Sequence, residues 1–204
     1  NTIAVNNGKT IELKSKNIII ATGSKPFSVP SFNLDKKRII TSTEALSLKE
    51  IPKKLIIVGA GVIGLELGSV YARMGSEVSV VDSADSVISS MDKSLGRELK
   101  KILVRDLGFK FYLSHQVETI NNNGKSIELV TISESNQKLS LKGDYCLISI
   151  GRKPYTSGLN LDAVGIERSD SGQIQVNESL QTSESNIYAI GDVISGPMLA
   201  HKAE

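Results

Sequence analysis

The sequence predicts an α/β protein built on a parallel sheet, and three observations lead to that fold class. An apolar strand at residues 54–58 runs into a glycine-rich turn and a helix. A second short apolar strand follows at residues 77–81. A long amphipathic helix and a third strand, at residues 109–113, come next. Strands that alternate with helices in this way are typical of parallel sheets with helices packed on them.

The turn after the first of these strands has the spacing Gly-x-Gly-x-x-Gly, formed by Gly59, Gly61 and Gly64. Gly59 permits a tight turn, Gly61 lets a phosphate approach the backbone, and Gly64 lets the helix pack closely on the strand. A pyrophosphate at this helix start would meet free N–H groups and the positive end of the helix dipole. In this strand–turn–helix context the motif predicts a dinucleotide-binding fold of the Rossmann type.

The strand at residues 77–81 ends at Asp82, roughly 20 positions beyond the glycines. An acidic residue at this place is the expected partner of the adenosine ribose hydroxyls. Because a carboxylate repels a ribose 2′-phosphate, Asp82 favours NAD over NADP. The alternative is that Asp82 only caps the turn that follows.

Two amphipathic helices are predicted in this region. The first spans residues 62–74 and stops at Gly75. The second is N-capped by Asp92 and closed by Gly108. The apolar residues at helical spacing are Ile63, Leu67, Val70, Tyr71 and Met74 in the first helix, and Leu95, Leu99, Ile102, Leu103 and Leu107 in the second.

The remaining pattern predicts further strands. Residues 116–120, 125–133 and 137–141 are expected to form a three-stranded antiparallel ribbon, followed by a buried strand at residues 145–150. Near the N-terminus we expect a hairpin of residues 2–5 and 9–13 around an Asn-Gly turn, and then a strand at 18–21. The segment 25–38 contains two prolines and is predicted to be an exposed connector, residues 43–46 one helical turn, and residues 186–190 a strand.

Segments 18–26 and 147–154 resemble each other, since each is an apolar strand that ends at a glycine and leaves through Lys-Pro. An Asn-Gly hairpin precedes both segments. We interpret them as two copies of one dinucleotide-binding design, of which the first retains only its final part. On this interpretation the chain is expected to be a piece of a longer protein.

Composition excludes several classes of protein. No apolar run approaches the 18 or so residues that span a bilayer, and no segment resembles a signal peptide. The net charge is only +2, and scattered basic pairs do not indicate a nucleic-acid patch. The single cysteine, Cys146, excludes an internal disulfide and is predicted to be a small buried hydrophobe. We therefore expect a soluble, cytoplasmic protein without nucleic-acid, membrane or metal partners.

Six motifs in order along the chain carry a family resemblance. They are Ala21–Ser24, Gly59–Gly68, Met91-Asp92, Gly151–Pro154, Ala189–Asp192 and Met198–Glu204. With them the whole chain resembles the pyridine nucleotide–disulfide oxidoreductases, and within that family the members that oxidise dihydrolipoyl groups. The resemblance implies an NAD-binding domain at residues 45–160, flanked by incomplete FAD-domain segments at 1–44 and 161–204.

The resemblance also implies roles for individual residues. The glycine loop would hold the NAD pyrophosphate and Asp82 the ribose, Val117 would border the adenine, and Gly151 and Glu66 would lie near the nicotinamide. The implied NAD contacts are Gly59, Ala60, Gly61, Val62, Ile63, Gly64, Leu65, Glu66, Asp82, Val117 and Gly151. The implied FAD contacts are Thr22, Gly23, Ser24, Asp192, Met198, Leu199, Ala200 and His201.

Each of these roles has a simpler structural alternative. Thr22 and Asp192 would also suit ordinary turns, and Glu66 would stabilise the helix dipole from the first turn. His201 is expected to contribute its backbone rather than its imidazole, and Arg152 is expected to be structural.

The implied activity is oxidation of dihydrolipoyl groups, with hydride passed through FAD to NAD in a homodimer that serves lipoyl domains of 2-oxo acid dehydrogenase complexes. The sequence departs from the family at Asp82, where glutamate is usual. It also has no counterpart of the paired redox cysteines, the FAD glycine loop or the His-Glu base, so no catalytic residue is expected in this chain and FAD is not expected to be retained. The alternatives are another NAD-linked flavoprotein, such as an NADH oxidase or mercuric reductase, and a non-catalytic NAD-binding module.

Overall fold

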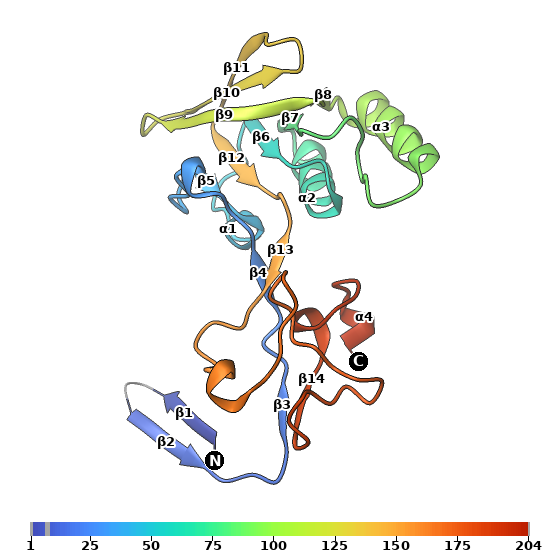
Figure 1. The fold of residues 1–204 in the computed structure, drawn as a ribbon. Helices are drawn as coiled ribbons and strands as arrows, with labels where there is room; N and C mark the ends of the chain where they lie inside the picture. The colour runs from blue at the N-terminus through green and yellow to red at the C-terminus, as the bar shows by residue number, and fades with distance from the viewer. Residues whose placement is uncertain (1, 7–8, 204) are drawn as a thin grey trace. The chain divides into compact units, whose positions relative to one another are not determined.

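The computed structural model describes residues 2–6 and 9–203, and it confirms the predicted α/β class (Figure 1). The chain divides into two compact units, Pro26–Gly151 and Asn1–Lys25 with Arg152–Glu204. This division differs from the predicted boundaries after residues 44 and 160. Residues 26–44 join the first of these units because β5 (Ile39–Ile40), which the sequence did not predict, pairs with its sheet.

The unit Pro26–Gly151 is built on a five-stranded parallel sheet in the order β5-β12-β6-β7-β8 (Figure 1). The strands other than β5 are β6 (Lys54–Val58), β7 (Glu77–Val81), β8 (Lys110–Tyr112) and β12 (Tyr145–Ile148). All pairs are parallel, with Val58 opposite Val81 and Ile148 opposite Val58. The carboxyl ends of β12, β6 and β7 therefore lie together at one edge of the sheet.

Both faces of this sheet are covered, as its continuous apolar strands require. Leu55 and Ile57 pack toward the helices, in one cluster with Leu65 and Leu103. The alternate residues Ile56 and Val58 pack on the other face against the ribbon side chains Ile120, Ile127 and Leu129. Burying each such side chain contributes about 1.5–3 kcal/mol.

The antiparallel ribbon has the order β11-β10-β9, as predicted. Its strands are β9 (His115–Asn122), β10 (Ile127–Ser133) and β11 (Lys138–Gly143). The carboxylate of Asp35 accepts hydrogen bonds from the backbone N–H groups of Lys37, Arg38 and Ile39, and from the side-chain amide of Asn122 at one end of β9. Burial is the largest single influence on the pKa of Asp35 and raises it, but these donors together bring the pKa below its usual value.

Helix α2 (Val62–Arg73) packs a narrower face than the apolar spacing suggests. Its buried residues are Gly64, Leu65, Gly68 and Tyr71, while Val70 and Met74 are about half exposed. The glycines allow the helix to pack closely on β6, because a Cβ on Gly68 would lie only 2.7 Å from Cδ1 of Ile57.

Helix α3 (Lys93–Leu107) has both predicted ends. The Asp92 carboxylate accepts a hydrogen bond from the N–H of Ser94 at 2.7 Å, and Gly108 takes the left-handed conformation that ends the helix. Of the predicted apolar face, Leu103 is buried, whereas Leu95 and Ile102 are exposed.

The segment 25–38 was predicted to be an exposed connector, and this is wrong for its apolar residues. It contains a short helix, η1 (Pro30–Phe32), and Phe32 and Leu34 pack against the ribbon side of the core. The prolines correctly indicated irregular backbone, but the aromatic and aliphatic side chains that follow Pro30 supply surface for packing.

The other unit contains two short pairs of strands in addition to the N-terminal hairpin. The hairpin is formed by β1 (Thr2–Asn6) and β2 (Lys9–Leu13), and its predicted Asn7-Gly8 turn lies outside the described residues. Strand β3 (Ile18–Ile20) pairs in parallel with β14 (Ile187–Ala189). Strand β4 (Ser24–Pro26) pairs with β13 (Arg152–Pro154), so the two similar Lys-Pro exits lie side by side.

Three short helices complete this unit, η2 (Leu161–Val164), η3 (Gly191–Val193) and α4 (Ala200–Ala203). Its core includes Leu161, Ile174, Ala189 and Val193. The remaining helix among the described residues, α1 (Ser42–Ala45), belongs to the unit Pro26–Gly151 and matches the predicted single turn. Among the described helices, none has the length and apolar character that crossing a membrane requires.

Candidate dinucleotide-binding site

The glycine loop between β6 and α2 is folded as tightly as its sequence predicts. Gly59 has φ +108°, and a Cβ there would lie 2.4 Å from the backbone oxygen of Ser149 at the end of β12. A Cβ on Gly64 would lie 2.4 Å from the carbonyl oxygen of Gly59. Backbone atoms cannot yield as a flexible side chain can, so both positions require glycine.

Gly61 differs from these two glycines. A Cβ there would meet no atom within 4 Å, and the backbone φ of −81° is one that any residue can adopt. The space beside Gly61 is therefore empty of protein and lies at the start of α2. An additional side chain would fill the space that a ligand needs.

Free backbone donors surround this space. The N–H of Ala60 donates to Asp82 and that of Leu65 to the Gly61 carbonyl, but within the described chain the N–H groups of Gly61, Val62, Ile63 and Gly64 donate to no acceptor. Unpaired N–H groups and the helix dipole together favour an anion at a helix N-terminus.

Asp82 lies at the end of β7, the strand next to the glycine loop in the sheet. One carboxylate oxygen accepts from the N–H of Ala60 at 2.6 Å, and the other accepts from the N–H of Ala84 at 2.9 Å. These bonds fix the orientation of the carboxylate beside the loop. Each carboxylate oxygen retains a lone pair for a ligand hydroxyl.

A cavity of about 470 Å³ opens at this edge of the sheet. That volume lies within the range of small-molecule sites, and the carboxyl ends of parallel strands are the expected place for one. Its lining residues are Phe27, Val29, Ser31, Phe32, Val58, Gly59, Val81, Asp82, Ser83, His115, Gln116, Val117 and Ile150. The structure therefore brings together the predicted Gly59, Asp82 and Val117.

The sequence reasoning missed several residues of this cavity. Ser83 lies two positions beyond the predicted strand 77–81, and Ile150 is the last residue of the predicted strand 145–150, so the rule that ligands bind at the carboxyl ends of strands was a usable signal. The residues from the segment 25–38 gave no such signal, because that segment was interpreted as an exposed connector.

Other predicted NAD contacts lie near the loop but do not line this cavity. Gly151, with φ +118°, accepts a hydrogen bond from the N–H of Phe27. Glu66 is exposed on α2, and no acidic side chain lies in the first turn of that helix. The predicted alternative role for Glu66, stabilising the helix dipole, is therefore weakened, since that effect fades beyond the first turn.

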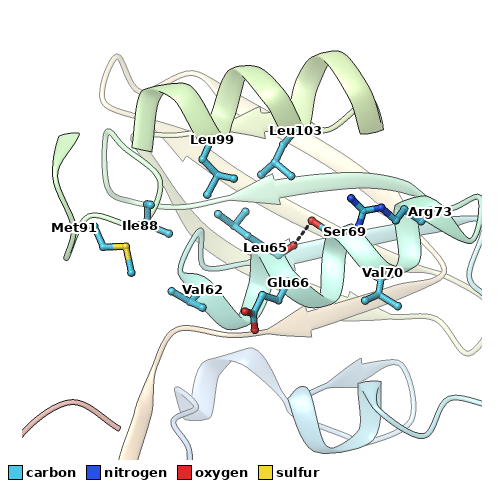
Figure 2. A pocket seen from close by; sticks show the side chains of 10 residues that line it. All are labelled: Val62, Leu65, Glu66, Ser69, Val70, Arg73, Ile88, Met91, Leu99 and Leu103. Carbon is cyan, nitrogen blue, oxygen red and sulfur yellow. Dashed lines mark hydrogen bonds between the residues drawn. The ribbon is translucent and has the colours of Figure 1, made fainter. Parts of the chain in front are cut away.

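A second cavity, of about 460 Å³, lies between α2 and α3 (Figure 2). Leu65, Leu99 and Leu103 line it, whereas Figure 2 shows the Glu66 carboxylate directed away from Leu99 and Leu103. Its lining is mostly aliphatic, so it lacks the array of donors that a dinucleotide requires. The predicted Val62 lines this second cavity rather than the first.

In the other unit, two predicted flavin contacts, Ser24 and Asp192, form one hydrogen-bonded group with Arg152. The Ser24 hydroxyl donates to the Asp192 carboxylate, and the Arg152 guanidinium donates to the Ser24 hydroxyl at 2.6 Å and to its carbonyl oxygen at 2.8 Å. Thr22 donates to the carbonyl oxygen of Tyr155 at 2.6 Å. Arg152 thus joins β4 to β13, in agreement with its predicted structural role.

The predicted flavin contacts Met198, Leu199, Ala200 and His201 lie at the start of α4, which contacts η3 and hence the neighbourhood of Asp192. The remaining predicted contact, Gly23, has φ +67° and accepts a hydrogen bond from the N–H of Tyr155.

The two implied cofactors fit the described residues to different extents. The donors around Gly61 and the fixed carboxylate of Asp82 suit a pyrophosphate and a ribose. For a flavin, the described residues offer the Asp192 carboxylate and the backbone at Gly23 but no second glycine loop. Cys146 is fully buried and its pKa is raised by burial, so this thiol is unsuited to redox exchange.

Comparison with known proteins agrees with these observations. The family model described as pyridine nucleotide-disulphide oxidoreductase matches residues 1–204. The mitochondrial dihydrolipoyl dehydrogenase of Pisum sativum is 48% identical over 198 residues, which cover 97% of this chain and 39% of the relative. The leghemoglobin reductase of Glycine max is also 48% identical over 198 residues. The chain thus spans about two fifths of the length of these relatives.

Solved structures give the same picture. The Cu(II) complex of the HOCl-induced flavoprotein disulfide reductase RclA from Escherichia coli has a TM-score of 0.89 at 30% identity, covering 98% of this chain and 44% of that one. LpdA from Mycobacterium tuberculosis has a TM-score of 0.88 at 29% identity, covering 98% of this chain and 43% of that one. This chain therefore belongs to the pyridine nucleotide-disulphide oxidoreductase family.

Proposed function

We propose that this chain is the NAD-binding part, with flanking flavin-side segments, of a dihydrolipoyl dehydrogenase. The protein that contains it would oxidise dihydrolipoyl groups carried by lipoyl domains of 2-oxo acid dehydrogenase complexes, as a homodimer. Identity of 48% to a dihydrolipoyl dehydrogenase, against 30% to RclA, favours this activity over that of the HOCl-induced reductase RclA.

One observation carries the proposal for the cofactor. The empty space beside Gly61 is bordered by unpaired N–H groups at the start of α2, and the fixed carboxylate of Asp82 lies beside it. Donors that are already in place lose little orientational freedom on binding, which favours affinity. A non-catalytic NAD-binding module would share this site, but none of the relatives named above is such a module by its name.

The residues of this chain would bind and orient the dinucleotide. The N–H groups of Gly61–Gly64 would donate to the pyrophosphate, and Asp82 would accept from the ribose hydroxyls. Glu66 and Gly151 would lie on the nicotinamide side. A bound flavin would accept two electrons from a dithiol by way of a cysteine pair and pass a hydride to NAD. The chain's one cysteine is buried, so that pair is not supplied here.

A thermal-shift measurement tests the choice of cofactor. At a free NAD concentration about 100 times Kd, binding stabilises the fold by about 2.7 kcal/mol. For a chain of this size that raises Tm by roughly 5–10 °C. NADP at the same concentration is expected to give a clearly smaller rise, because its 2′-phosphate would face the Asp82 carboxylate. Equal shifts for NAD and NADP would contradict the proposal.

Two variants sharpen this test. Asp82→Asn removes the charge at nearly constant side-chain volume. It is expected to reduce the difference between the Tm rise caused by NAD and the Tm rise caused by NADP. Asp85→Asn changes an exposed acidic residue of the same loop, and Asp85 does not line the cavity. The difference in Tm rise between NAD and NADP should therefore be the same as in the unchanged chain.

A further inference from the structure

His115 lines the 470 Å³ cavity, and none of the roles assigned above uses it. His115 is the first residue of β9, and it follows Ser114, whose φ of +54° is unusual for a residue other than glycine. The left-handed residue redirects the chain between β8 and β9. Uncommon backbone conformations of this kind are concentrated at functional sites.

The backbone holds His115 at a fixed place relative to Asp82. The N–H of His115 donates to the carbonyl oxygen of Asp82 at 2.9 Å, and the N–H of Asp82 donates to the carbonyl oxygen of Tyr112 at 3.0 Å. The N–H of Ser114 donates to the carbonyl oxygen of Ala84 at 2.9 Å. Three hydrogen bonds therefore join the segment after β7 to the end of β8 and the start of β9, and they place His115 next to Asp82.

The ring of His115 is oriented as well. Its Nδ1 lies 2.7 Å from the carbonyl oxygen of Leu113, and because a carbonyl only accepts, Nδ1 carries the proton in this bond. The ring also packs edge-on against Tyr112, at 6.1 Å between centroids. In the neutral imidazole Nε2 is then a hydrogen-bond acceptor, and it has no partner within the described part of the chain.

The neighbouring side chains indicate which ligand group this acceptor meets. Side chains at alternate positions of a strand share a face, so His115 and Val117 lie on one face of β9, and both line the cavity. Val117, Phe32 and Ile150 offer apolar walls suited to a flat base. Asp82 is assigned to the ribose hydroxyls, and among the other lining residues His115 combines a ring that a hydrogen bond orients with an acceptor nitrogen.

We propose that His115 determines specificity for the base, by accepting a hydrogen bond from the 6-amino group of adenine. This inference rests on the proposed dinucleotide site and deepens it. In hypoxanthine a carbonyl oxygen replaces the 6-amino group, so two acceptors would face each other. An unpaired buried polar group costs enough to change affinity by about tenfold.

The test compares NAD with nicotinamide hypoxanthine dinucleotide by calorimetric titration of the 204-residue chain. The unchanged chain is expected to bind NAD about tenfold more tightly. His115→Phe, which keeps an aromatic ring against Tyr112 but has no ring nitrogen, is expected to bind the two dinucleotides equally. Thr119→Ala changes an exposed residue of the same strand that does not line the cavity, so this control is expected to keep the full preference for NAD.

The outcomes separate this inference from the proposed function. If the unchanged chain binds both dinucleotides with equal affinity, the role of His115 is refuted while the dinucleotide site stands. The same holds if His115→Phe retains the preference, or if Thr119→Ala abolishes it. If neither dinucleotide binds, both proposals fail. The comparison on the unchanged chain needs no variant, so it can refute the role of His115 even if His115→Phe folds poorly.

Discussion

Alanine substitutions at two glycines of the same loop are expected to have opposite effects on folding and on binding. Gly61→Ala places a methyl group where no protein atom lies within 4 Å, at a φ that an alanine accepts. Replacing a glycine by alanine at such a position stabilises a fold by about 0.4–1 kcal/mol, because the unfolded chain then has less conformational entropy to lose on folding. Gly64→Ala instead brings a methyl group to 2.4 Å from the Gly59 carbonyl oxygen and is expected to cost about 1–3 kcal/mol.

The effect on cofactor affinity separates the two variants further. The methyl group of Gly61→Ala occupies the space assigned to the pyrophosphate and separates it from the N–H donors. A hydrogen bond to a charged group contributes about 1.5–3 kcal/mol, so losing one weakens NAD binding about 10- to 100-fold. The folded state meanwhile keeps its stability.

Two measurements check both halves of this prediction. Because the chain has no tryptophan, urea unfolding is followed by far-ultraviolet circular dichroism, and NAD affinity by calorimetry. A Gly61→Ala variant that binds NAD as the unchanged chain does would show that the pyrophosphate lies elsewhere. A Gly64→Ala variant with undiminished stability would show that the contact at Gly64 does not limit packing.

Three further predictions concern the fold. The thiol of Cys146 is fully buried and should react with a thiol reagent only as fast as the chain unfolds; rapid labelling in native buffer would contradict that burial. Tyr71→Phe removes the hydroxyl that donates to the buried carbonyl of Ala45 and is expected to lower the unfolding free energy by about 1–3 kcal/mol in urea, whereas an unchanged midpoint would contradict the bond. Folding lowers the pKa of Asp35, so its contribution is present above its ordinary pKa of 3.8 and is lost as the pH falls through the folded value. The stability difference between the unchanged chain and Asp35→Asn should therefore shrink below about pH 4, and a difference independent of pH would refute this.

The elements that the sequence predicted are those with strong local signals. The strand at Lys54–Val58, the glycine turn and the following helix combine an apolar run, fixed glycine spacing and helical periodicity. Asp92 and Gly108 mark the ends of α3 with side-chain and backbone chemistry that acts within one turn. Such signals come from a few neighbouring residues, so they do not depend on how the chain packs in three dimensions.

What the sequence did not predict depends on packing between distant segments. Two residues, Ile39 and Ile40, are too short a run to indicate a strand, and they form one only because β12 offers them an edge. Apolar spacing predicted a wide face for α2, whereas the helix packs on the sheet through Gly64 and Gly68, and Val70 is about half exposed.

The candidate site divides in the same way. Gly59 and Asp82 were predicted from a motif whose spacing reflects the ligand itself. Phe32 and His115 line the same cavity but come from a connector and from the start of a ribbon strand, and no spacing rule links them to the glycines. They were found only when the fold brought those segments to one edge of the sheet.

The most direct test of the central claim is an amide nitrogen–hydrogen correlation spectrum of the ¹⁵N-labelled chain, recorded while NAD is added. We predict that the backbone amide protons of Gly61, Val62, Ile63 and Gly64 move downfield as they acquire an acceptor, and that the amide of Ala60, already bonded to Asp82, moves less. Resonances of the loop that stay in place while those around Leu99 and Leu103 shift would contradict the account, because the dinucleotide would then occupy the apolar cavity between the helices.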